Sequence, residues 1–176
     1  MLIESFLDYL RLERNYSERT IVSYRTDLRE FGGFLENTEA ELDWKKVHAD
    51  HVRNWMVSLM EGGKAATSVN RKLSSLRSFY RFLLRKKVVA VNPMLKIVGP
   101  KKKKPLPFFV REKDMNRLLD EIPFKEGFEG CRDRTILEMF YATGMRLSEL
   151  IGLNDADVDF ASKLIKVTGK RNKQRL

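Results

Sequence analysis

One arginine and one lysine in the last third of the chain stand where chemistry on a phosphate would need them. Arg146 lies in the run ATGMRLSEL (142–150), and Lys170 lies in the run GKRNKQR (169–175). A guanidinium can donate two parallel hydrogen bonds to the oxygens of one phosphate. The two residues therefore predict a site that acts on a phosphodiester.

The residues around Arg146 indicate how its backbone is held. Gly144 can adopt the left-handed conformation that ends a helix, so Arg146 is expected in the first turn of a new short helix. Glu149 follows three residues later, close enough on a helix to orient the guanidinium. Apolar residues should form the buried sides of the two helices: Ile136, Leu137 and Phe140 in the first, and Leu147, Leu150 and Ile151 in the second.

Two short strands are expected before Lys170, which then lies in a second turn led by Gly169. The apolar residues that predict them flank the turn at 161–162: Val158 and Phe160, then Leu164, Ile165 and Val167. Taken alone, an arginine at a helix start is usually a surface group, and a lysine in a hairpin turn usually keeps a strand edge soluble. The two runs together favour a shared site.

Both runs resemble the first catalytic box and the strand-turn lysine of the tyrosine recombinase (phage integrase) family, and the Xer-type recombinases most of all. The interval between Arg146 and Lys170 is similar to that of the family. The resemblance implies that a tyrosine attacks a DNA phosphate, forms a 3′-phosphotyrosyl link and is displaced by the 5′-hydroxyl of another strand. In that scheme Arg146 stabilises charge on the phosphate, Lys170 is the general acid and Glu149 is a supporting acidic residue. Arg171 departs from the family's usual Gly-Lys-Gly turn.

Other catalytic residues of the family have no counterparts in the sequence. The resemblance implies a His-x-x-Arg box, a further His or Trp and a tyrosine nucleophile near the C-terminus, whereas His48 and His51 both lie upstream of Arg146. The last tyrosine, Tyr141, also precedes Arg146 and is expected on a packed helix, so no nucleophile is expected in this chain. We therefore interpret the chain as the N-terminal part of a longer recombinase. By itself, this part is expected to bind DNA without cleaving it.

Loose packing is expected for residues 108–176, because a segment of about 70 residues rarely forms a stable core without cover from elsewhere. Cys131 is the lone cysteine; it cannot form an internal disulfide and is expected as a small buried thiol. His48 and His51 have no further ligands at suitable spacing, so no metal site is predicted.

The charge of the chain is positive and unevenly distributed. The 176 residues carry a net charge of +10 and are 43% hydrophobic and 33% charged, as expected for a globular protein of one or two domains. The segment between Gly62 and Arg111 contains many lysines and arginines and no aspartate or glutamate. Such a segment repels itself unless an anionic polymer lies against it, so nucleic acid is the expected partner. No apolar run of membrane-spanning length and no signal pattern is present, and a cytoplasmic location is expected.

Four helices are expected in the N-terminal part. Capping residues and glycines indicate where these helices begin and end. The first is expected to end near Asn15, and the second to begin at Ser17. The third is expected to begin at Asp50 and to end at Gly62 and Gly63, and the fourth to begin at Thr67 or Ser68. Their buried faces are predicted by apolar spacing: Ile3, Phe6, Leu7 and Leu10; Ile21, Tyr24, Leu28, Phe31 and Leu35; Val52, Trp55, Met56 and Leu59; and Val69, Leu73, Leu76, Tyr80 and Leu83.

The fourth helix also has a face that combines cations with short polar side chains, as suits a helix lying against a DNA backbone. Its run TSVNRKLSSLRSFY (67–80) resembles the core-binding (SAM-like) domain of the family, which clamps one side of the target duplex, so the resemblance covers essentially the whole chain. A merely solvated basic helix is the alternative. The predicted DNA-contacting residues are Thr67, Asn70, Arg71, Lys72, Ser75, Arg77, Ser78 and Arg81, with Thr20, Arg25 and Arg29 as weaker candidates.

A linker is predicted at 99–107, where prolines on both sides of a lysine run keep the chain extended. Its lysines, Lys101, Lys102, Lys103 and Lys104, are expected to lie along phosphates; a nuclear-import signal is the alternative on composition. The predicted domains are a helical core-binding domain at 1–98 and the first part of a catalytic domain at 108–176, in which a helix begins near Arg111.

The expected fold class is mainly α, with a four-helix SAM-like domain followed by the start of a mixed α+β catalytic domain that carries a small antiparallel sheet. The implied function is site-specific DNA recombination, with no metal and no cofactor because the phosphotyrosyl link preserves the bond energy. The implied partners are double-stranded DNA and other recombinase subunits in a homo- or hetero-tetramer, in the cytoplasm on the nucleoid. The alternative is a non-catalytic DNA-binding or regulatory protein on the same scaffold.

Overall fold

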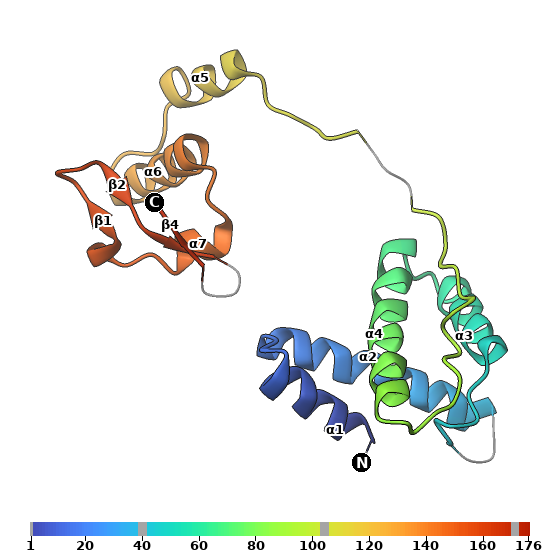
Figure 1. The fold of residues 1–176 in the computed structure, drawn as a ribbon. Coiled ribbons are helices and arrows are strands. Elements are labelled where there is room, and N and C mark those ends of the chain that lie inside the picture. Colours follow the sequence, from blue (N-terminus) through green and yellow to red (C-terminus); the bar gives the residue numbers. More distant parts are fainter. Residues whose placement is uncertain (1, 39–41, 103–105, 170–172) are drawn as a thin grey trace. The chain divides into compact units, whose positions relative to one another are not determined.

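A computed structural model of the chain describes residues 2–38, 42–102, 106–169 and 173–176. The backbone divides into two compact units, Met1–Pro105 and Leu106–Leu176. Figure 1 colours the first unit from blue through green and the second from yellow through red. None of the helices in the described ranges is both long enough and apolar enough to span a lipid bilayer.

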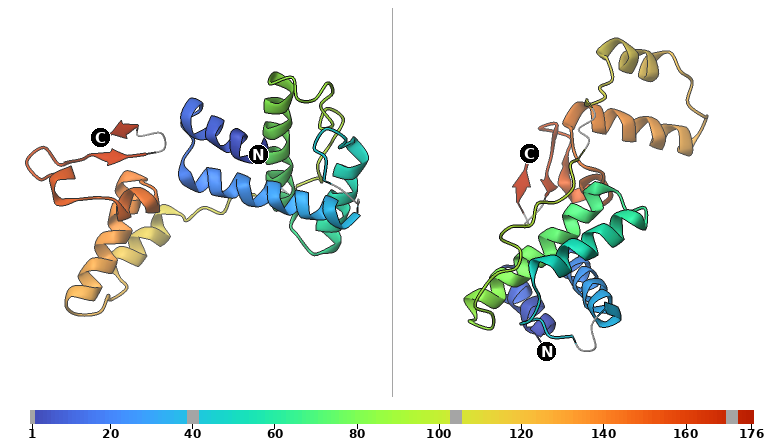
Figure 2. Two further views of the ribbon diagram at one scale, coloured as in Figure 1. Left: turned by 90° about the horizontal axis from the view of Figure 1, so that it is seen from below. Right: turned by 90° about the vertical axis from the view of Figure 1, so that its right-hand side faces the viewer.

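The first unit is a bundle of helices (Figures 1 and 2). Helix α2 packs against α1, α3 and α4, and α4 also contacts α1 and α3. The helices are α1 at Leu2–Asp8, continued by a π-helical turn at Tyr9–Glu13, α2 at Glu18–Thr38, α3 at Ala49–Glu61 and α4 at Ala66–Arg85. The four helices predicted from apolar spacing are therefore confirmed in this part of the chain.

The largest fully buried side chains in the core of the first unit are aromatic. Phe6, Trp55 and Phe79 are each at most 1% exposed. The rings of Phe6 and Phe79 meet edge to face with their centroids 5.3 Å apart, an arrangement that the ring quadrupoles favour. The Tyr80 hydroxyl donates a hydrogen bond to the Trp44 backbone oxygen at 3.3 Å. Burial raises the pKa of the Tyr80 phenol, which therefore stays protonated in the core.

Two helices begin earlier than predicted. The cap of α3 is His48 rather than Asp50, because the His48 backbone N–H donates to Nδ1 of His51 at 3.0 Å. Asp50 lies inside the first turn, where its negative charge is favourable at the positive end of the helix dipole. Helix α4 likewise begins directly after Ala65, ahead of the predicted polar caps.

After α4 the chain turns back beside that helix as an irregular segment, here called the strap (residues 88–100). Its side chains at Met94 and Ile97 are 3% and 6% exposed and belong to the core. Two side chains of α4 hold the strap by its backbone: Asn70 Nδ2 donates to the Pro100 oxygen at 2.9 Å and Arg77 Nη2 donates to the Ile97 oxygen at 3.0 Å. The strap is therefore a packed part of the first unit.

The second unit combines helices with two small antiparallel sheets, in which β1 pairs with β2 and β3 pairs with β4. The predicted pair of strands around the 161–162 turn is therefore present. The elements are α5 at Glu112–Asp120, α6 at Phe128–Thr143, α7 at Leu147–Ile151, a 3₁₀ turn at Asp155–Asp157, β1 at Val158–Asp159, β2 at Leu164–Ile165, β3 at Val167–Thr168 and β4 at Gln174–Arg175.

Packing in the second unit is loose, as expected. Among its described residues, Met145 and Val167 are the buried hydrophobic side chains, and α5 buries none of its residues. Three predictions for this unit are wrong. Leu147 and Ile151 are 63% and 75% exposed rather than buried, and Cys131 is exposed rather than a core thiol. Tyr141 is 50% exposed rather than on a packed helix, because α6 buries only Gly130 among its residues. No described element covers Leu147 and Ile151.

Candidate functional site

Arg146 stands at the start of a helix, in a backbone position that is fixed on both sides. Gly144 ends α6 in the left-handed conformation, with φ at 60°, and its N–H donates to the Phe140 oxygen at 2.9 Å. Met145 is buried in the turn, and Arg146 follows as the N-terminal cap of α7. The predictions that Gly144 ends one helix and that Arg146 begins the next are confirmed.

Glu149 holds Arg146 through both oxygens of its carboxylate. The Arg146 backbone N–H donates to Oε2 at 2.8 Å, and Nη1 of its side chain donates to Oε1 at 2.7 Å. The Glu149 side chain is 2% exposed and that of Arg146 is 59% exposed, so a buried carboxylate fixes a guanidinium that faces solvent. The backbone hydrogen bond from Arg146 is the main cause that holds the pKa of Glu149 below its ordinary value. The predicted orienting contact is therefore present.

A second guanidinium, which no sequence pattern indicated, binds the same carboxylate. Arg175 on β4 donates from Nη2 to Oε2 of Glu149 at 2.9 Å, and 48% of its side chain is exposed. In the β3–β4 register Arg175 lies opposite Val167, and β3 packs against α7. The contact joins residues that are far apart in sequence, so only the register of this hairpin could have indicated it.

The segment in which Lys170 is predicted to act begins beside this cluster. Lys170 itself lies outside the described residues, whereas Gly169 lies within them. A Cβ on Gly169 would stand 3.0 Å from Oε1 of Glu149 and 3.7 Å from Nη1 of Arg146. The Gly169 N–H donates to the Lys173 oxygen at 2.7 Å. The backbone therefore passes the Arg146–Glu149 pair one residue before Lys170, and the missing side chain at Gly169 permits this close approach.

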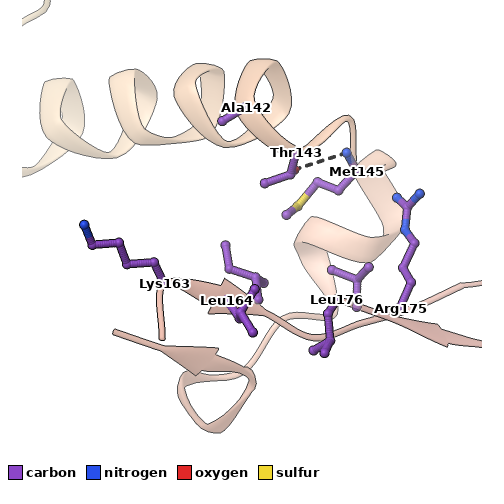
Figure 3. A pocket seen from close by; sticks show the side chains of 9 residues that line it. Ala142, Thr143, Met145, Lys163, Leu164, Arg175 and Leu176 are labelled. Atoms are coloured by element: carbon purple, nitrogen blue, oxygen red, sulfur yellow. Dashed lines mark hydrogen bonds between the residues drawn. The ribbon is translucent and has the colours of Figure 1, made fainter. Parts of the chain in front are cut away.

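A cavity of about 330 Å³ borders the cluster. It lies where the end of α6 faces the strands, and Met145, Lys163, Leu164 and Arg175 are among the residues that line it (Figure 3). In Figure 3 the Arg175 side chain extends from β4 toward the turn that carries Met145. Of the cluster of Arg146, Glu149 and Arg175, the residue that lines this cavity is Arg175.

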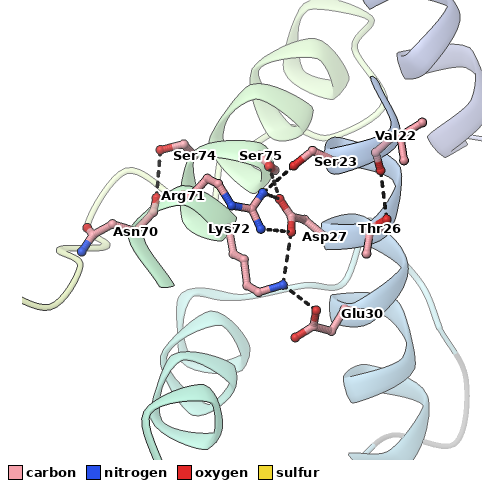
Figure 4. Close-up of polar contacts among 10 residues, drawn as sticks. All are labelled: Val22, Ser23, Thr26, Asp27, Glu30, Asn70, Arg71, Lys72, Ser74 and Ser75. Atoms are coloured by element: carbon pink, nitrogen blue, oxygen red, sulfur yellow. Dashed lines mark hydrogen bonds and ion pairs between the residues drawn. The ribbon is translucent and has the colours of Figure 1, made fainter. Parts of the chain in front are cut away.

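In the first unit, a buried polar cluster lies between α2 and α4 (Figure 4). Asp27 of α2 is fully buried and accepts hydrogen bonds from Arg71 at 2.6 and 2.8 Å, from Ser75 at 2.7 Å and from Lys72 at 3.2 Å. The Lys72 ammonium also binds Glu30 at 2.5 Å. A buried carboxylate needs such partners to stay charged, and together they fix α4 against α2.

This cluster corrects two of the predicted DNA contacts. The Lys72 side chain is 8% exposed and Ser75 is 2% exposed, and both bind Asp27. Neither side chain can reach a phosphate from that position, so both hold the two helices together instead. Arg71 binds the same carboxylate but keeps 51% of its side chain in solvent.

The remaining predicted residues of α4 lie at or near its surface. Thr67 and Arg81 are exposed, and Ser78 is half-buried. Asn70 and Arg77 are half-buried as well, because both donate to backbone oxygens of the strap. The structure thus brings Thr67, Arg71, Ser78 and Arg81 to the solvent side of one helix.

The candidates outside α4 differ in their surroundings. Arg25 on α2 is half-buried, and its guanidinium pairs at 3.2 Å with a glutamate of α1, which offsets its charge. Lys101 and Lys102 are exposed, whereas Lys103 and Lys104 lie outside the described residues. Two linker cations are therefore open to an anionic partner.

Two family models match the chain. The model described as "Phage integrase, N-terminal SAM-like domain" matches residues 3–87, and the model described as "Phage integrase family" matches residues 109–176. The first match covers the helices of the first unit. The second match includes Arg146, Glu149 and Arg175.

Curated relatives match along nearly the whole chain. A tyrosine recombinase XerC of Staphylococcus carnosus (strain TM300) is 42% identical over 172 residues, which are 98% of this chain and 57% of the relative. A tyrosine recombinase XerC of Pediococcus pentosaceus is 41% identical over 174 residues, which are 99% of this chain and 58% of the relative. The chain therefore spans less than two thirds of the length of these relatives.

Solved structures share the fold at low sequence identity. A lambda integrase (75-356) dimer bound to a COC′ core site has a TM-score of 0.68 at 15% identity, with 99% of this chain and 57% of that chain covered. The Tn1549 transposon integrase in complex with circular intermediate DNA has a TM-score of 0.66 at 16% identity, with coverages of 98% and 57%. A lambda integrase tetramer bound to a Holliday junction has a TM-score of 0.70 at 13% identity, with coverages of 99% and 48%.

The fold is thus of the integrase type, with a helical SAM-like unit followed by a mixed unit in which an arginine caps a short helix, and the predicted fold class is confirmed. Both units match family models, and relatives at about 40% identity carry the name tyrosine recombinase. The chain belongs to the phage integrase family of tyrosine recombinases.

Proposed function

We propose that the whole protein is a site-specific DNA recombinase, in which residues 1–105 bind DNA and residues 106–176 contribute the first part of the catalytic unit. The observation that carries the proposal is the Arg146 guanidinium, 59% exposed and yet fixed by the buried Glu149 carboxylate. An arginine held in this way can aim its donors at two oxygens of one phosphate. The names of the curated relatives support the same reaction class.

In the proposed reaction a tyrosine oxygen attacks the phosphorus of a DNA phosphodiester. The bond to the 5′-oxygen breaks, and a 3′-phosphotyrosyl link forms. Arg146 donates to the non-bridging oxygens on which negative charge develops, and Lys170 gives a proton to the departing 5′-oxygen. The 5′-hydroxyl of another strand then displaces the tyrosine, so the energy of the bond is retained and no cofactor is consumed.

We assign the tyrosine nucleophile to a part of the whole protein other than these 176 residues. Tyr80 is fully buried in the core of the first unit, and Tyr141 stands on α6, five residues before Arg146. By itself the chain therefore binds DNA without cutting it.

The DNA-contacting surface is proposed on the solvent side of α4, at Thr67, Arg71, Ser78 and Arg81, here called the α4 face. Lys101 and Lys102 in the linker add to it. Cations and short hydroxyl side chains on one helix suit a sugar-phosphate backbone, because the hydroxyls allow close approach and the cations release counterions.

Double-stranded DNA and further recombinase subunits are the proposed partners. Strand exchange joins two duplexes and needs more than one subunit, and solved relatives include a dimer on a core site and a tetramer on a Holliday junction. A protein of this class would act in the cytoplasm, on the nucleoid.

DNA binding can be tested with the 176-residue chain. Fluorescence anisotropy with a labelled duplex should give an affinity whose logarithm falls linearly with the logarithm of the salt concentration. Binding that does not change with salt would contradict a surface that follows phosphates.

Catalysis can be tested with the product of the complete gene. On a nicked duplex that traps the covalent link, the wild type should form a protein–DNA adduct, and Arg146→Ala should reduce its rate by about 10²–10³-fold while duplex affinity changes little. Equal loss of binding and cleavage would make Arg146 a structural residue. A wild type that binds but forms no adduct would favour a non-catalytic DNA-binding protein.

A further inference from the structure

Two guanidiniums from different elements share the buried carboxylate of Glu149. Arg146, the cap of α7, binds Oε1 at 2.7 Å, and Arg175, on β4, binds Oε2 at 2.9 Å. The two arginine side chains are 59% and 48% exposed, whereas the glutamate side chain is 2% exposed. The negative charge is therefore covered, and the two positive charges face solvent.

The second arginine changes the charge that the cluster presents. A lone Arg146–Glu149 pair is neutral, so its attraction for an anion falls off steeply beyond contact distance. With Arg175 the cluster carries one net positive charge, and the excess lies on the exposed side. Strand β4 thus adds an electrostatic contribution to the site at the start of α7.

Arg175 also restricts the carboxylate. Oε2 accepts from the Arg146 backbone N–H at 2.8 Å as well as from Arg175, and Oε1 lies 3.0 Å from the position of a Cβ on Gly169. The Glu149 carboxylate cannot turn without losing a contact to α7 or to β4. Since the carboxylate is fixed, the Arg146 guanidinium that it binds has a preferred orientation.

We propose that Arg175 is a positioning residue for Arg146. It acts through Glu149, because it holds the carboxylate that orients the Arg146 guanidinium, and it supplies the positive charge that draws a phosphate toward Arg146. The identity of the anion, a DNA phosphodiester, rests on the proposed function. The coupling of the two arginines through Glu149 rests on the contacts themselves.

The coupling can be measured in the 176-residue chain by NMR of its labelled arginine side chains, with inorganic phosphate as the probe. In the wild type the Arg146 guanidinium protons should exchange slowly with solvent, and their signals should shift as phosphate is added. Arg175→Ala should speed this exchange and raise the Kd for phosphate, each by at least about threefold, as expected for loss of one partly exposed ion pair. Arg175→Lys retains the charge and a donor for Oε2, and it should restore both quantities.

Arg134→Ala is the matched control, because Arg134 is also half exposed, at 50%, and pairs with Glu138 at 2.8 Å in the same unit. It removes the same charge and should leave exchange and phosphate affinity at Arg146 unchanged. Equal effects of the two alanine variants would mean that the loss of net charge alone causes them, and this would overturn the proposal. Wild-type exchange at Arg146 in Arg175→Ala would overturn it as well.

If Arg175→Ala unfolds the second unit, a third variant tests the positioning role of Arg175. Arg175→Gln keeps a donor for Oε2 and removes the charge, so exchange at Arg146 should stay slow while phosphate affinity falls. Undiminished phosphate affinity in this variant would overturn the proposal. Duplex binding by the wild type is a separate measurement: its absence, with the coupling present, would overturn the proposed function and leave the positioning role of Arg175 intact.

Discussion

The Arg71 guanidinium and the Asp27 carboxylate form a two-pronged ion pair between α4 and α2, with Nη1 2.6 Å from Oδ2 and Nη2 2.8 Å from Oδ1. The two partners lie in opposite surroundings, because the Asp27 side chain is 1% exposed and that of Arg71 is 51% exposed. The same arginine therefore holds the bundle together and faces solvent on the proposed DNA-contacting helix. Its removal is expected to affect folding and binding at once.

Removal of the Asp27 carboxylate should destabilise the first unit strongly. Asp27→Ala leaves the buried Lys72 ammonium with one partner fewer, and breaking a buried ion pair costs roughly 3–5 kcal/mol. Urea unfolding followed by circular dichroism measures the change in free energy. Asp50→Ala is the control, since the Asp50 side chain is 80% exposed and its pair with Arg53 contributes less than about 1 kcal/mol. Similar losses in both variants would contradict a structural role for the buried cluster.

Arg81 offers a cleaner test of DNA binding than Arg71, because it is exposed on α4 and can be removed without opening the Asp27 cluster. Arg81→Ala should weaken duplex binding by about 1 kcal/mol at low salt and reduce the salt dependence by about one counterion. Arg53→Ala, which removes an arginine paired with Asp50 on α3, should change neither quantity. If both variants lose the same affinity, binding depends on net charge and not on the α4 face.

Gly169 should tolerate no side chain. In Gly169→Ala the new Cβ would stand 3.0 Å from Oε1 of Glu149, so the β3–β4 turn or the carboxylate must move, at a cost of about 1–3 kcal/mol. Differential scanning calorimetry should show the transition of the second unit at lower temperature. Gly33→Ala provides the contrast, because no atom lies within 4 Å of its new Cβ and alanine favours the helix α2. A Gly169→Ala protein with unchanged stability would show that Gly169 is not packed on Glu149.

The ion pair between Glu149 and Arg146 should be lost in acid. The pKa of this carboxyl lies below its ordinary value of 4.5, chiefly because of the Arg146 backbone hydrogen bond. A carboxyl with a lowered pKa stabilises the fold above its ordinary pKa, and this contribution disappears as pH falls through the lowered value. Exchange of the Arg146 guanidinium protons, corrected for the intrinsic pH dependence of exchange, should therefore be constant from pH 8 down to about 5 and rise in stronger acid. Glu149→Gln should abolish this step; a step that persists in the variant must come from another group.

The parts of the site that the sequence indicated are the local ones. Gly144, Arg146 and Glu149 lie within six residues, and helix geometry alone places the carboxylate next to the guanidinium. Arg175 reaches the same carboxylate only because the β3–β4 hairpin folds back onto α7, which no local spacing encodes. Lys170 lies outside the described residues, and its place in the site stays a prediction.

The misplaced residues have a common physical cause, which is that neighbouring elements decide burial. Lys72 and Ser75 are polar, so the sequence predicts them on the surface. Both side chains instead donate to the buried Asp27 carboxylate on α2, which keeps them inside the bundle. Leu147 and Ile151 are apolar and were predicted inside, but no described element lies over them. The helices themselves were predictable because their apolar spacing is long and regular.

Helix α4 ends at Arg85, yet the autonomous folding unit does not end there. The strap fills the core with Met94 and Ile97, and its backbone accepts the donors of Asn70 and Arg77. A chain cut at the helix end would leave a void. It would also remove the Ile97 acceptor of Arg77 and leave the Asn70 amide with the Ala66 oxygen of its own helix. Limited proteolysis should accordingly leave a resistant core that runs to about Pro100, and shorter versions of this domain should aggregate or melt early.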